Sequence, residues 1–352
     1  MIELRSDTFT LPTKEMLEAI PLAALGDDVY QEDPTVKQLQ QHAADVMGKE
    51  AAIFMPSGTM ANLSAIMAHS PRGSKVLVGD ETDIFIYEAG GAAVCGGVMY
   101  EPIRTKKDGT LAIEDLAEAI PKEFEDPQFA LPSLICLENP HNRMGGRVLP
   151  LSYLHEVSVF AKENQLPVHM DGARVFNAAV ALDLPVNEIA QYADSLQFCL
   201  SKGLSAPIGS MVVGSHDFIQ KVYRIRKMLG GGMRQVGIMA APGIVALEKM
   251  VDRLREDHQN AYKLAEGLSR MDGIHCDIQM VETNIVFFTI EHPNISWQNF
   301  VKMAKERGLH VAELGYGRIR AVTHAGVKSS EVDEALEIIE HIMQEAVVGH
   351  FS

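Results

Sequence analysis

Residues 196–203 read Leu196-Gln197-Phe198-Cys199-Leu200-Ser201-Lys202-Gly203, which places a lysine directly after an apolar run. An apolar run of this length, followed by serine and glycine, predicts a buried strand over 195–200. In open α/β sheets, ligands bind in the crevice outside the carboxyl ends of the strands, so Lys202 is well placed to meet one. Lysine amines form Schiff bases when desolvation or a neighbouring charge lowers their pKa. A single lysine is more often a solvated surface residue, so other residues have to decide its role.

An acidic residue ends a second predicted strand, 202 − 171 = 31 residues upstream of this lysine. Asp171 follows the strand expected over 167–170 and opens the segment Asp171-Gly172-Ala173-Arg174. A carboxylate in this place can face the ring nitrogen of pyridoxal phosphate and keep it protonated, so that the ring withdraws electrons from the substrate Cα. An aspartate that only caps the next helix is an equally good interpretation of this position alone.

A small polar turn lies between the strand predicted over 51–55 and the helix predicted over 60–69. Its residues are Ser57, Gly58 and Thr59. Free N–H groups, hydroxyls and the helix dipole can hold a phosphate there, although many such turns only cap a helix. A phosphate turn, an aspartate at a strand end and a lysine after another strand, in this order, fit a pyridoxal-phosphate enzyme of the aspartate-aminotransferase fold.

The chain repeats an apolar run, a turn and a helical pattern, which is typical of an α/β protein with a mainly parallel sheet. A helix is expected over 33–48, with Asp33 as its cap, Pro34 at its first position and Gly48 at its end. The other predicted strands of one doubly wound, seven-stranded sheet are 75–78, 98–103, 133–138 and 210–213.

The pattern changes near residue 242. One long helical pattern runs through Val251, Leu254 and Leu264, alternating runs at 284–290 and 318–322 follow, and a last helix is expected from Ser330. We therefore expect an N-terminal segment and a large cofactor-binding α/β domain over 1–241, and a small C-terminal α+β domain over 242–352.

Composition limits the partners of this protein. Of 352 residues, 47% are hydrophobic and 22% charged, which is a globular composition with room for a large core. The net charge of −16 makes nucleic acid and anionic membranes poor partners. No apolar stretch is long enough to span a membrane, and the charged N-terminus does not fit a signal peptide, so a cytoplasmic protein is expected.

The cysteines point to neither disulfides nor a metal site. Cys95, Cys136, Cys199 and Cys276 form no CxxC pair, and each lies within an apolar run. We therefore expect four buried thiols and no bound metal.

Further motifs extend over almost the full length. In the first half they are Leu4-Arg5-Ser6-Asp7-Thr8, Gly26-Asp27-Asp28-Val29-Tyr30, Asp33-Pro34-Thr35-Val36, Tyr87-Glu88-Ala89-Gly90-Gly91 and Leu137-Glu138-Asn139-Pro140-His141-Asn142. In the second half they are Asp171-Gly172-Ala173-Arg174, Ser201-Lys202-Gly203-Leu204 and Gly230-Gly231-Gly232-Met233-Arg234-Gln235. With these motifs the chain resembles the threonine aldolase family of the aspartate-aminotransferase fold, within the broader group of β-eliminating lyases.

The resemblance implies a role for each matching residue. Pyridoxal phosphate would be bound covalently, as an aldimine at Lys202, with Asp171 at its ring nitrogen. Gly58 and Thr59 would hold the phosphate. Arg174 would touch the phenolic oxygen of the cofactor and the substrate carboxylate, which Ser6 and Arg320 would share. Two arginines suit this task because a guanidinium binds a carboxylate through two parallel hydrogen bonds, although either could be a surface ion pair.

The glycine-rich segment 230–232 implies a shared active site. Lys227 and Arg234 flank it, and in the family a similar segment reaches the phosphate of the neighbouring subunit. The resemblance thus implies a homotetramer, built as a dimer of dimers, with Tyr30 at the same interface and beside the substrate. Without the resemblance, a helix break with solvated charges would explain the segment.

One position departs from the family. Its aldolases carry a histidine four residues before the aromatic residue of the Glu-Ala-Gly-Gly motif, where it stacks over the cofactor ring and contacts the substrate hydroxyl. Here Asp83 takes that place, and an ionised carboxylate neither stacks nor donates a hydrogen bond. A second family histidine is also missing, and Gln128 is the nearest candidate for its place. The base that takes the proton of the β-hydroxyl could be Asp83, His141, His169 or a bound water.

The expected function is therefore cleavage of the Cα–Cβ bond of a β-hydroxy-α-amino acid, with threonine and allo-threonine as default substrates and glycine and an aldehyde as products. Asp83 keeps other reactions on the same scaffold open, namely β-elimination, racemisation or transaldol transfer. A cofactor-binding relative without turnover is a further alternative, against which the pair of Lys202 and Asp171 argues. A plain α/β binding module without a cofactor is the least favoured.

Overall fold

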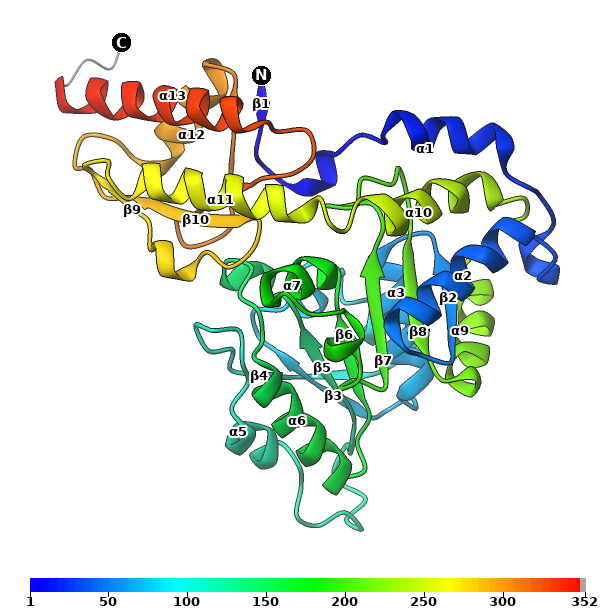
Figure 1. Cartoon of the computed structure of the whole chain (residues 1–352). Helices are drawn as coiled ribbons and strands as arrows, with labels where there is room; N and C mark the ends of the chain where they lie inside the picture. The colour runs from blue at the N-terminus through cyan, green and yellow to red at the C-terminus, as the bar shows by residue number, and fades with distance from the viewer. Residues whose placement is uncertain (349–352) are drawn as a thin grey trace.

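The computed structural model describes residues 1–348. Within them, the largest element is a seven-stranded sheet with the strand order β2-β8-β7-β6-β5-β3-β4 (Figure 1). Its strands are β2 (Ala51–Met55), β3 (Lys75–Gly79), β4 (Met99–Ile103), β5 (Pro132–Glu138), β6 (Val168–Asp171), β7 (Ser195–Cys199) and β8 (Ser210–Gly214). The predicted strands and the mainly parallel sheet are confirmed.

One strand of this sheet, β8, runs against the others. It pairs antiparallel with both β2 and β7, whereas the pairs from β7 to β4 are parallel. The other six strands therefore point the same way, and their carboxyl ends share one edge. In sheets of this kind that edge is where ligands bind.

Helices cover both faces of the sheet, which gives three layers (Figure 1). One face carries α3 (Gly58–His69) and α9 (His216–Met228), which pack on each other and on β2 and β8. The other face carries α2 (Pro34–Met47), α6 (Leu151–Glu163), α7 (Val175–Leu182) and α10 (Gly237–Lys249), whose apolar side chains form the main core. The short helices are α1 (Lys14–Ala19), α4 (Asp83–Ile86), α5 (Ile113–Glu118) and α8 (Asn187–Ala190).

The helix α2 follows the prediction closely. The side chain of Asp33 accepts a hydrogen bond from the N–H of Val36, and Pro34 takes the first helical position. Gly48 ends the helix at φ +63°, a left-handed conformation that residues with a Cβ rarely adopt. Local sequence alone therefore determines both ends of this helix.

The C-terminal part forms a second, smaller layer of strands and helices. The antiparallel strands β9 (Ile274–His275), β10 (Ile285–Ile290), β13 (Ile319–Val322) and β12 (Ala312–Glu313) are covered by α11 (Leu254–Leu268), α12 (Trp297–Glu306) and α13 (Ser329–Val348). The predicted strands at 284–290 and 318–322 and the last helix are confirmed. The first strand, β1 (Ile2–Glu3), pairs with β11 (Leu309–His310), so the N-terminus packs with this smaller part rather than with the large sheet.

Two expectations differ from the structure, and a third is not tested by it. The long helical pattern after residue 242 is two helices, α10 and α11, separated at residues 250–253. The predicted boundary between residues 241 and 242 falls inside α10, which packs on α2, so the division into two domains at that point stays a prediction. Cys95 is exposed because it lies in the short helical segment Ala92–Gly96 at the surface, while the other three thiols are buried as expected.

Along the described part of the chain, no helix is long and apolar enough to cross a membrane.

Candidate active site

A pocket of about 280 Å³ lies at the shared carboxyl edge of the sheet. The loops after β2, β3, β6 and β7 bring residues from distant parts of the sequence to it. The predicted site residues among its lining are Gly58, Thr59, Asp83, Asp171 and Lys202. This pocket is the candidate active site.

Lys202 follows β7 and faces the same pocket as Asp171. Burial alone would lower the pKa of its amine, but the negative charges near it, at Cys199, Asp83 and Asp7, outweigh burial and the repulsion by Arg174. The pKa of Lys202 therefore lies above its ordinary value. The lowered pKa that favours Schiff-base formation is thus not found for this lysine, because Cys199 at the end of β7 and Asp83 and Asp7 from two other segments raise it.

Asp171 ends β6 and is buried beneath the pocket. Its Oδ1 accepts hydrogen bonds from Gln197 Nε2 at 2.5 Å and from the N–H of Ala173 at 3.0 Å, and its Oδ2 accepts one from Asn62 Nδ2 at 2.8 Å. Burial raises the pKa of Asp171, while the charge of Lys202 and these hydrogen bonds oppose the increase. Three N–H donors around one carboxylate far exceed what a helix cap needs.

The N-terminus of α3 forms another wall of the pocket. Ser57 caps the helix by accepting the N–H of Met60, and Gly58 and Thr59 begin the first turn. A Cβ added at Gly58 would lie 3.0 Å from Cys199 Sγ, tighter than ordinary contact, so glycine leaves open the space between this turn and β7. The unpaired N–H groups of the first turn make this wall suitable for an anion.

Asp83 stands at the start of α4, directly after β3, and is held from two sides. Asn142 Nδ2 lies 3.0 and 3.3 Å from its two carboxylate oxygens. The backbone N–H of Asp83 donates to Glu138 Oε2 at 2.6 Å, and Glu138 Oε1 accepts the N–H of Asn142 at 2.8 Å. Burial and the charge of Asp83 raise the pKa of Glu138 well above its ordinary value. Glu138 thus ties together the two loops that place Asp83.

The two histidines considered as bases lie outside the residues that line the pocket. His141 is buried and its Nδ1 lies 3.7 Å from Glu138 Oε1, and burial lowers its pKa to about 4. His169 is buried below Asp171 in β6, and burial lowers its pKa to about 3. Of the side chains considered for this role, Asp83 alone contacts the pocket in the described part of the chain.

Arg174 forms an ion pair with Asp7, which the sequence did not predict. Its Nε and Nη2 donate to the two carboxylate oxygens of Asp7, each at 2.7 Å, and both residues are buried. Burial would raise the pKa of Asp7, but the charge of Arg174 holds it well below its ordinary value. The hydroxyl of Ser6, next to Asp7, accepts a hydrogen bond from the N–H of Thr8. The expected substrate contact of Arg174 is therefore left to its Nη1.

Arg320 lies in β13 and is also buried. Its Nη1 donates to Asn142 Oδ1 at 2.7 Å and its Nη2 to the carbonyl oxygen of Arg5 at 3.0 Å. Its Nε is buried without a partner among the residues described. Burial and the nearby charge of Arg174 lower the pKa of Arg320 to about 10. An added carboxylate would satisfy the Nε and relieve this repulsion.

Six predicted site residues are not among those that line the pocket. Ser6, Arg174 and Arg320 are buried, whereas the other three lie on the surface. Lys227 and Tyr30 are exposed, and Arg234 donates to Asp27 Oδ2 at 3.0 Å on the surface. Neither Gln128 nor the neighbouring Phe129 lines the pocket as described. The structure of a single chain does not bring Lys227, Arg234 and Tyr30 to the catalytic lysine.

The sequence interpretation missed three polar residues of the site, Asn62, Glu88 and Gln197. Glu88 accepts a hydrogen bond from Asn62 Nδ2 at 2.8 Å, and burial together with the charge of Asp171 raises its pKa to about 9. Gln197 is a polar residue in the middle of a buried strand, and Asn62 interrupts a mostly apolar helix. Uncharged polar residues in otherwise apolar elements were the signal that could have revealed both.

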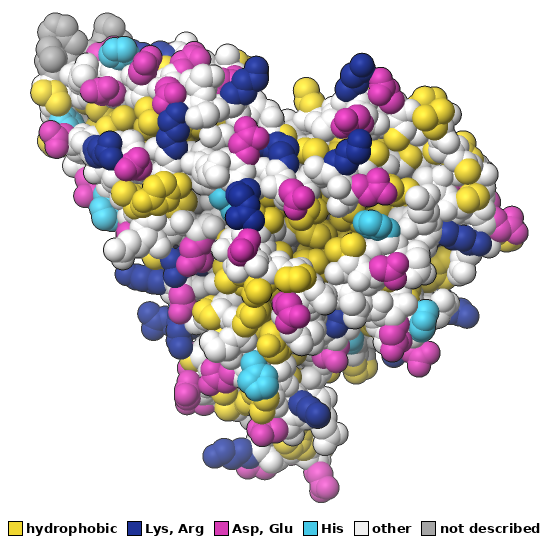
Figure 2. Space-filling view, viewed as in Figure 1, with side chains coloured by type: hydrophobic (Ala, Val, Ile, Leu, Met, Phe, Trp, Pro, Cys, Tyr) yellow, Lys and Arg dark blue, Asp and Glu magenta, His cyan; other side chains and the backbone are white. Residues whose placement is uncertain are grey.

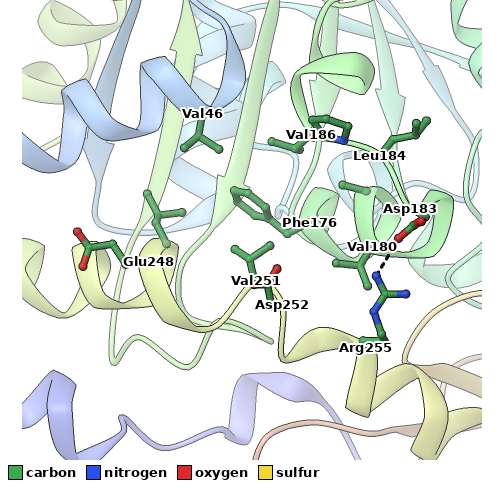
Figure 3. A pocket seen from close by; sticks show the side chains of 13 residues that line it. Val46, Phe176, Val180, Asp183, Leu184, Val186, Glu248, Val251, Asp252 and Arg255 are labelled. Atoms are coloured by element: carbon green, nitrogen blue, oxygen red, sulfur yellow. Dashed lines mark hydrogen bonds and ion pairs between the residues drawn. The ribbon is translucent and has the colours of Figure 1, made fainter.

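A second pocket, of about 490 Å³, lies between α2, α7 and α10 (Figure 3). Figure 3 shows mainly apolar side chains around it, among them Phe176, Val180 and Val251, with the ion pair of Arg255 and Asp183 at 2.9 Å. None of the predicted site residues is among its described lining. The chemistry-bearing side chains are thus concentrated in the smaller pocket at the sheet edge.

A lysine, a buried aspartate and a helix N-terminus around one pocket, at the carboxyl edge of a mainly parallel seven-stranded sheet, define the class of fold-type I pyridoxal-phosphate enzymes. More narrowly, the chain belongs to the beta-eliminating lyase family, whose family model matches residues 3–292.

Known proteins agree with this assignment. A low specificity L-threonine aldolase of Escherichia coli K12 is 45% identical over 334 residues, which cover 95% of this chain and 97% of that protein. Among solved structures, a threonine aldolase of Leishmania major shares the fold with a TM-score of 0.81 at 18% identity, over 97% of this chain and 99% of that one. A structure described as SPT with its PLP internal aldimine shares it with a TM-score of 0.76 at 18% identity, over 99% and 88%.

Proposed function

We propose that this chain is a pyridoxal-phosphate-dependent lyase that cleaves the Cα–Cβ bond of β-hydroxy-α-amino acids, converting L-threonine or L-allo-threonine to glycine and acetaldehyde. One observation carries the proposal. Lys202, Asp171 and the N-terminus of α3 surround a single pocket in a chain that is 45% identical, over 334 residues, to a bacterial low specificity L-threonine aldolase.

The residues of the pocket fit the cofactor. The first turn of α3, with Ser57, Gly58 and Thr59, offers N–H groups and hydroxyls to a phosphate, and Gly58 keeps the space beside Cys199 open. Asp171 Oδ1 already accepts two hydrogen bonds, but Oδ2 accepts one from Asn62 and retains a lone pair for a protonated ring nitrogen. Lys202 shares the pocket and supplies the amine for covalent attachment.

When bound, pyridoxal phosphate supplies an electron-withdrawing ring that accepts the electron pair of the broken bond. The chain positions the substrate for this step. Arg320, whose Nε is buried without a partner among the described residues, and Arg174 Nη1 would bind the carboxylate of the amino acid, with Ser6 beside them. A carboxylate held by two arginines fixes the orientation of Cα and therefore which bond faces the ring.

Asp83 is the proposed base. Its carboxylate would take the proton of the β-hydroxyl, so that the O–H electron pair forms the aldehyde carbonyl while the Cα–Cβ bond breaks. Cα then takes up a proton to give glycine. Asn142 supports this role because its amide holds Asp83 by hydrogen bonds while Arg320 holds the amide oxygen, which links the base to the group that binds the carboxylate.

The enzyme is further proposed to act as a homotetramer, a dimer of dimers, in the cytoplasm. Lys227 and Arg234 lie outside the pocket of their own chain, which supports a role at the phosphate of a neighbouring subunit. Tyr30 is exposed as well, and it ends the segment 26–30, whose Asp27 accepts a hydrogen bond from Arg234. Cysteines that form no disulfide among the described residues are what a reducing compartment favours.

Product analysis tests the reaction. The protein, reconstituted with pyridoxal phosphate, is incubated separately with L-threonine and L-allo-threonine, and glycine, acetaldehyde, ammonia and 2-ketobutyrate are measured together. Equimolar glycine and acetaldehyde are expected. Ammonia with 2-ketobutyrate would instead establish β-elimination, the second candidate, which the carboxylate at position 83 keeps open.

Replacement of the lysine provides the control. Lys202→Ala is expected to abolish turnover and keep the fold, because its amine is the proposed point of covalent attachment while its backbone carbonyl still accepts Thr10 Oγ1. Circular dichroism and gel filtration check the fold. A normal rate from a folded Lys202→Ala protein would remove the covalent role of this lysine.

A further inference from the structure

A chain of side-chain hydrogen bonds leads from Asp171 through the interior of the sheet to the end of α3. Asn62 Nδ2 lies 2.8 Å from Asp171 Oδ2, and Asn62 Oδ1 lies 3.0 Å from His169 Nε2. His169 Nδ1 lies 2.9 Å from Ser195 Oγ, and Ser195 Oγ lies 2.8 Å from His69 Nε2. Asn62, His169 and Ser195 are buried, at 1%, 0% and 0% exposure.

The strand register explains how these groups meet. His169 pairs with Ser195, and Asp171 pairs with Gln197, in the parallel ladder of β6 and β7. Because side chains alternate along a strand, these four residues share the face of the sheet on which α3 packs. Asn62 and His69 reach that face from α3. Polar residues on adjacent strands are thus collected under one helix.

The chemistry of the partners determines which atoms donate. Asn62 Nδ2 faces Asp171 Oδ2 and Glu88 Oε1, both at 2.8 Å. The Asp171 carboxylate already accepts two other N–H groups, so the Asn62 amino group, and not its oxygen, must point at it. Asn62 Oδ1 therefore faces His169, and His169 Nε2 must carry a hydrogen to donate to it.

The directions of the other hydrogen bonds in this network follow from the assignment of Asn62. Burial lowers the pKa of His169 to about 3 and that of His69 to about 4, so each ring is neutral and has one N–H. With the hydrogen of His169 on Nε2, its Nδ1 accepts from the hydroxyl of Ser195, and Ser195 Oγ accepts from His69 Nε2. From His69 to Asn62, each side chain of the network therefore donates its hydrogen bond toward Asp171.

We propose that Asn62, His169 and Ser195 are positioning residues that fix the tautomer of His169, and through it the orientation of the Asn62 amide, so that Asp171 Oδ2 is held toward the ring nitrogen of the cofactor. The inference rests on the proposed function, since it requires Asp171 to bind pyridoxal phosphate. If the amide of Asn62 turned over, its oxygen would face the carboxylate of Asp171, which would lose a donor and its fixed direction.

The test is a double-mutant cycle with the affinity for pyridoxal phosphate as readout, measured by absorbance titration of the cofactor-free protein. His169→Leu removes the donor to Asn62 and is expected to weaken cofactor binding about tenfold or more. Ser195→Ala, which lets His169 change tautomer, is expected to weaken it by a smaller factor. In the Asn62→Ala background both changes are expected to add less than about twofold, because they act through Asn62.

Two further variants separate this role from general packing. His169→Gln is expected to recover most of the affinity, because its amide N–H lies near the place of His169 Nε2 and can donate to Asn62. Ser64→Ala is the matched control: Ser64 is a buried serine of α3 whose hydroxyl has no partner among the described residues, so its loss is expected to leave binding unchanged.

The outcomes are distinct. If the unmodified protein does not bind pyridoxal phosphate, the proposed function itself is wrong. If it binds, but folded His169→Leu and Ser195→Ala bind equally well, or the losses simply add to that of Asn62→Ala, the positioning chain is wrong. If His169→Leu does not fold, Ser195→Ala and His169→Gln still decide the question. A His169→Gln protein that binds pyridoxal phosphate as weakly as Asn62→Ala would also contradict the proposed hydrogen-bond network.

Discussion

A carboxylate at position 83 changes which protons the pocket can move. Asn142 holds Asp83 in place but does not neutralise it, so its charge is directed at the pocket. Asp83→Asn keeps the shape and removes the base, and kcat for threonine cleavage is expected to fall about 100-fold or more while KM changes little. Steady-state kinetics with Lys202→Ala as the zero-activity reference measure this. An unchanged kcat would assign the proton transfer to another group, such as water.

The substitution Asp83→His restores the histidine of the family and tests whether Asp83 has a catalytic role of its own. Asp83→His introduces a ring that can stack and donate, but it loses the two contacts with Asn142. We expect a lower rate, because the surrounding loops are arranged around a carboxylate. The rate of acetaldehyde release decides, and a higher rate would mean that the pocket still suits the histidine.

The raised pKa of Glu88 predicts how the stability of the protein depends on pH. Burial and the charge of Asp171 raise its pKa from 4.5 to about 9 in the folded protein, so the folded state keeps a proton that the unfolded state loses between these values. The free energy of unfolding should therefore fall as pH rises through this window, by at most about 1.4 kcal/mol per pH unit for one proton. Glu88→Gln cannot titrate, so its curve is expected to be flatter. Urea unfolding of both cofactor-free proteins measures the difference, and parallel curves would contradict the assignment.

Some residue roles could be predicted from sequence and others could not, for a physical reason. Lys202, Asp171 and the turn at Gly58 each stand at the end of an apolar run, so their place at the sheet edge follows from local pattern. The partner of Arg174 is Asp7, 167 residues away, and only the folded chain brings them together. The raised pKa of Lys202 comes from the nearby Cys199 and from Asp83 and Asp7, and only the folded chain brings the two aspartates close to the lysine.

At the scale of elements, the strands were predictable because the sheet is covered on both faces. A strand buried on both sides is a continuous apolar run, and such runs mark β2, β3, β5 and β8 clearly. The break between α10 and α11 was not predictable from periodicity, since apolar spacing continues across residues 250–253, where the chain leaves the helical conformation. The pairing of β1 with β11 joins the two ends of the sequence and has no local signal.

Asp33 links three elements and sets a prediction for stability. Its carboxylate accepts the N–H groups of Val36 in α2, Gly26 in the N-terminal segment and Gly237 at the start of α10, and it is 1% exposed. Asp33→Ala leaves three N–H groups without their acceptor and is expected to lower the free energy of unfolding by about 2–4 kcal/mol. Urea denaturation measures this loss.

An exposed residue of the same helix is the control for Asp33. Among the described residues, the carboxylate of Asp45 accepts only the side-chain amide of Gln41, at the surface, so Asp45→Ala is expected to change stability by less than about 0.5 kcal/mol. Equal effects of the two substitutions would mean that Asp33 does not join α2, α10 and the N-terminal segment energetically.

At the scale of the whole molecule, the N-terminal segment presents unusually many apolar side chains to solvent. Exposed side chains there are Phe9, Leu11, Leu17, Leu22, Leu25 and Tyr30. Figure 2 shows apolar side chains at the surface on this side of the molecule, beside the charged ones. Neighbouring apolar side chains left exposed on a single chain are typical of a protein–protein interface, which supports the proposed homotetramer.

The proposed sharing of active sites can be separated from mere association. Lys202 lies in the pocket of its own chain, whereas Arg234 lies on the surface, where its side chain is 53% exposed and pairs with Asp27. A surface pair of this kind contributes little to stability, so Arg234→Ala should fold. If Arg234 serves the neighbour's phosphate, Arg234→Ala and Lys202→Ala damage the same site from different subunits.

Mixed assemblies of these two variants should therefore regain activity that neither has alone. In a dimer with one Lys202→Ala chain and one Arg234→Ala chain, one site carries both defects and the other carries both intact residues. Random mixing makes half of the dimers mixed, each with one intact site of two, so about a quarter of the unmodified activity is expected. The two variants are unfolded, mixed and refolded together with pyridoxal phosphate, and each variant refolded alone is the control. Activity no higher than the average of the two controls would mean that Arg234 acts within its own chain or not at all.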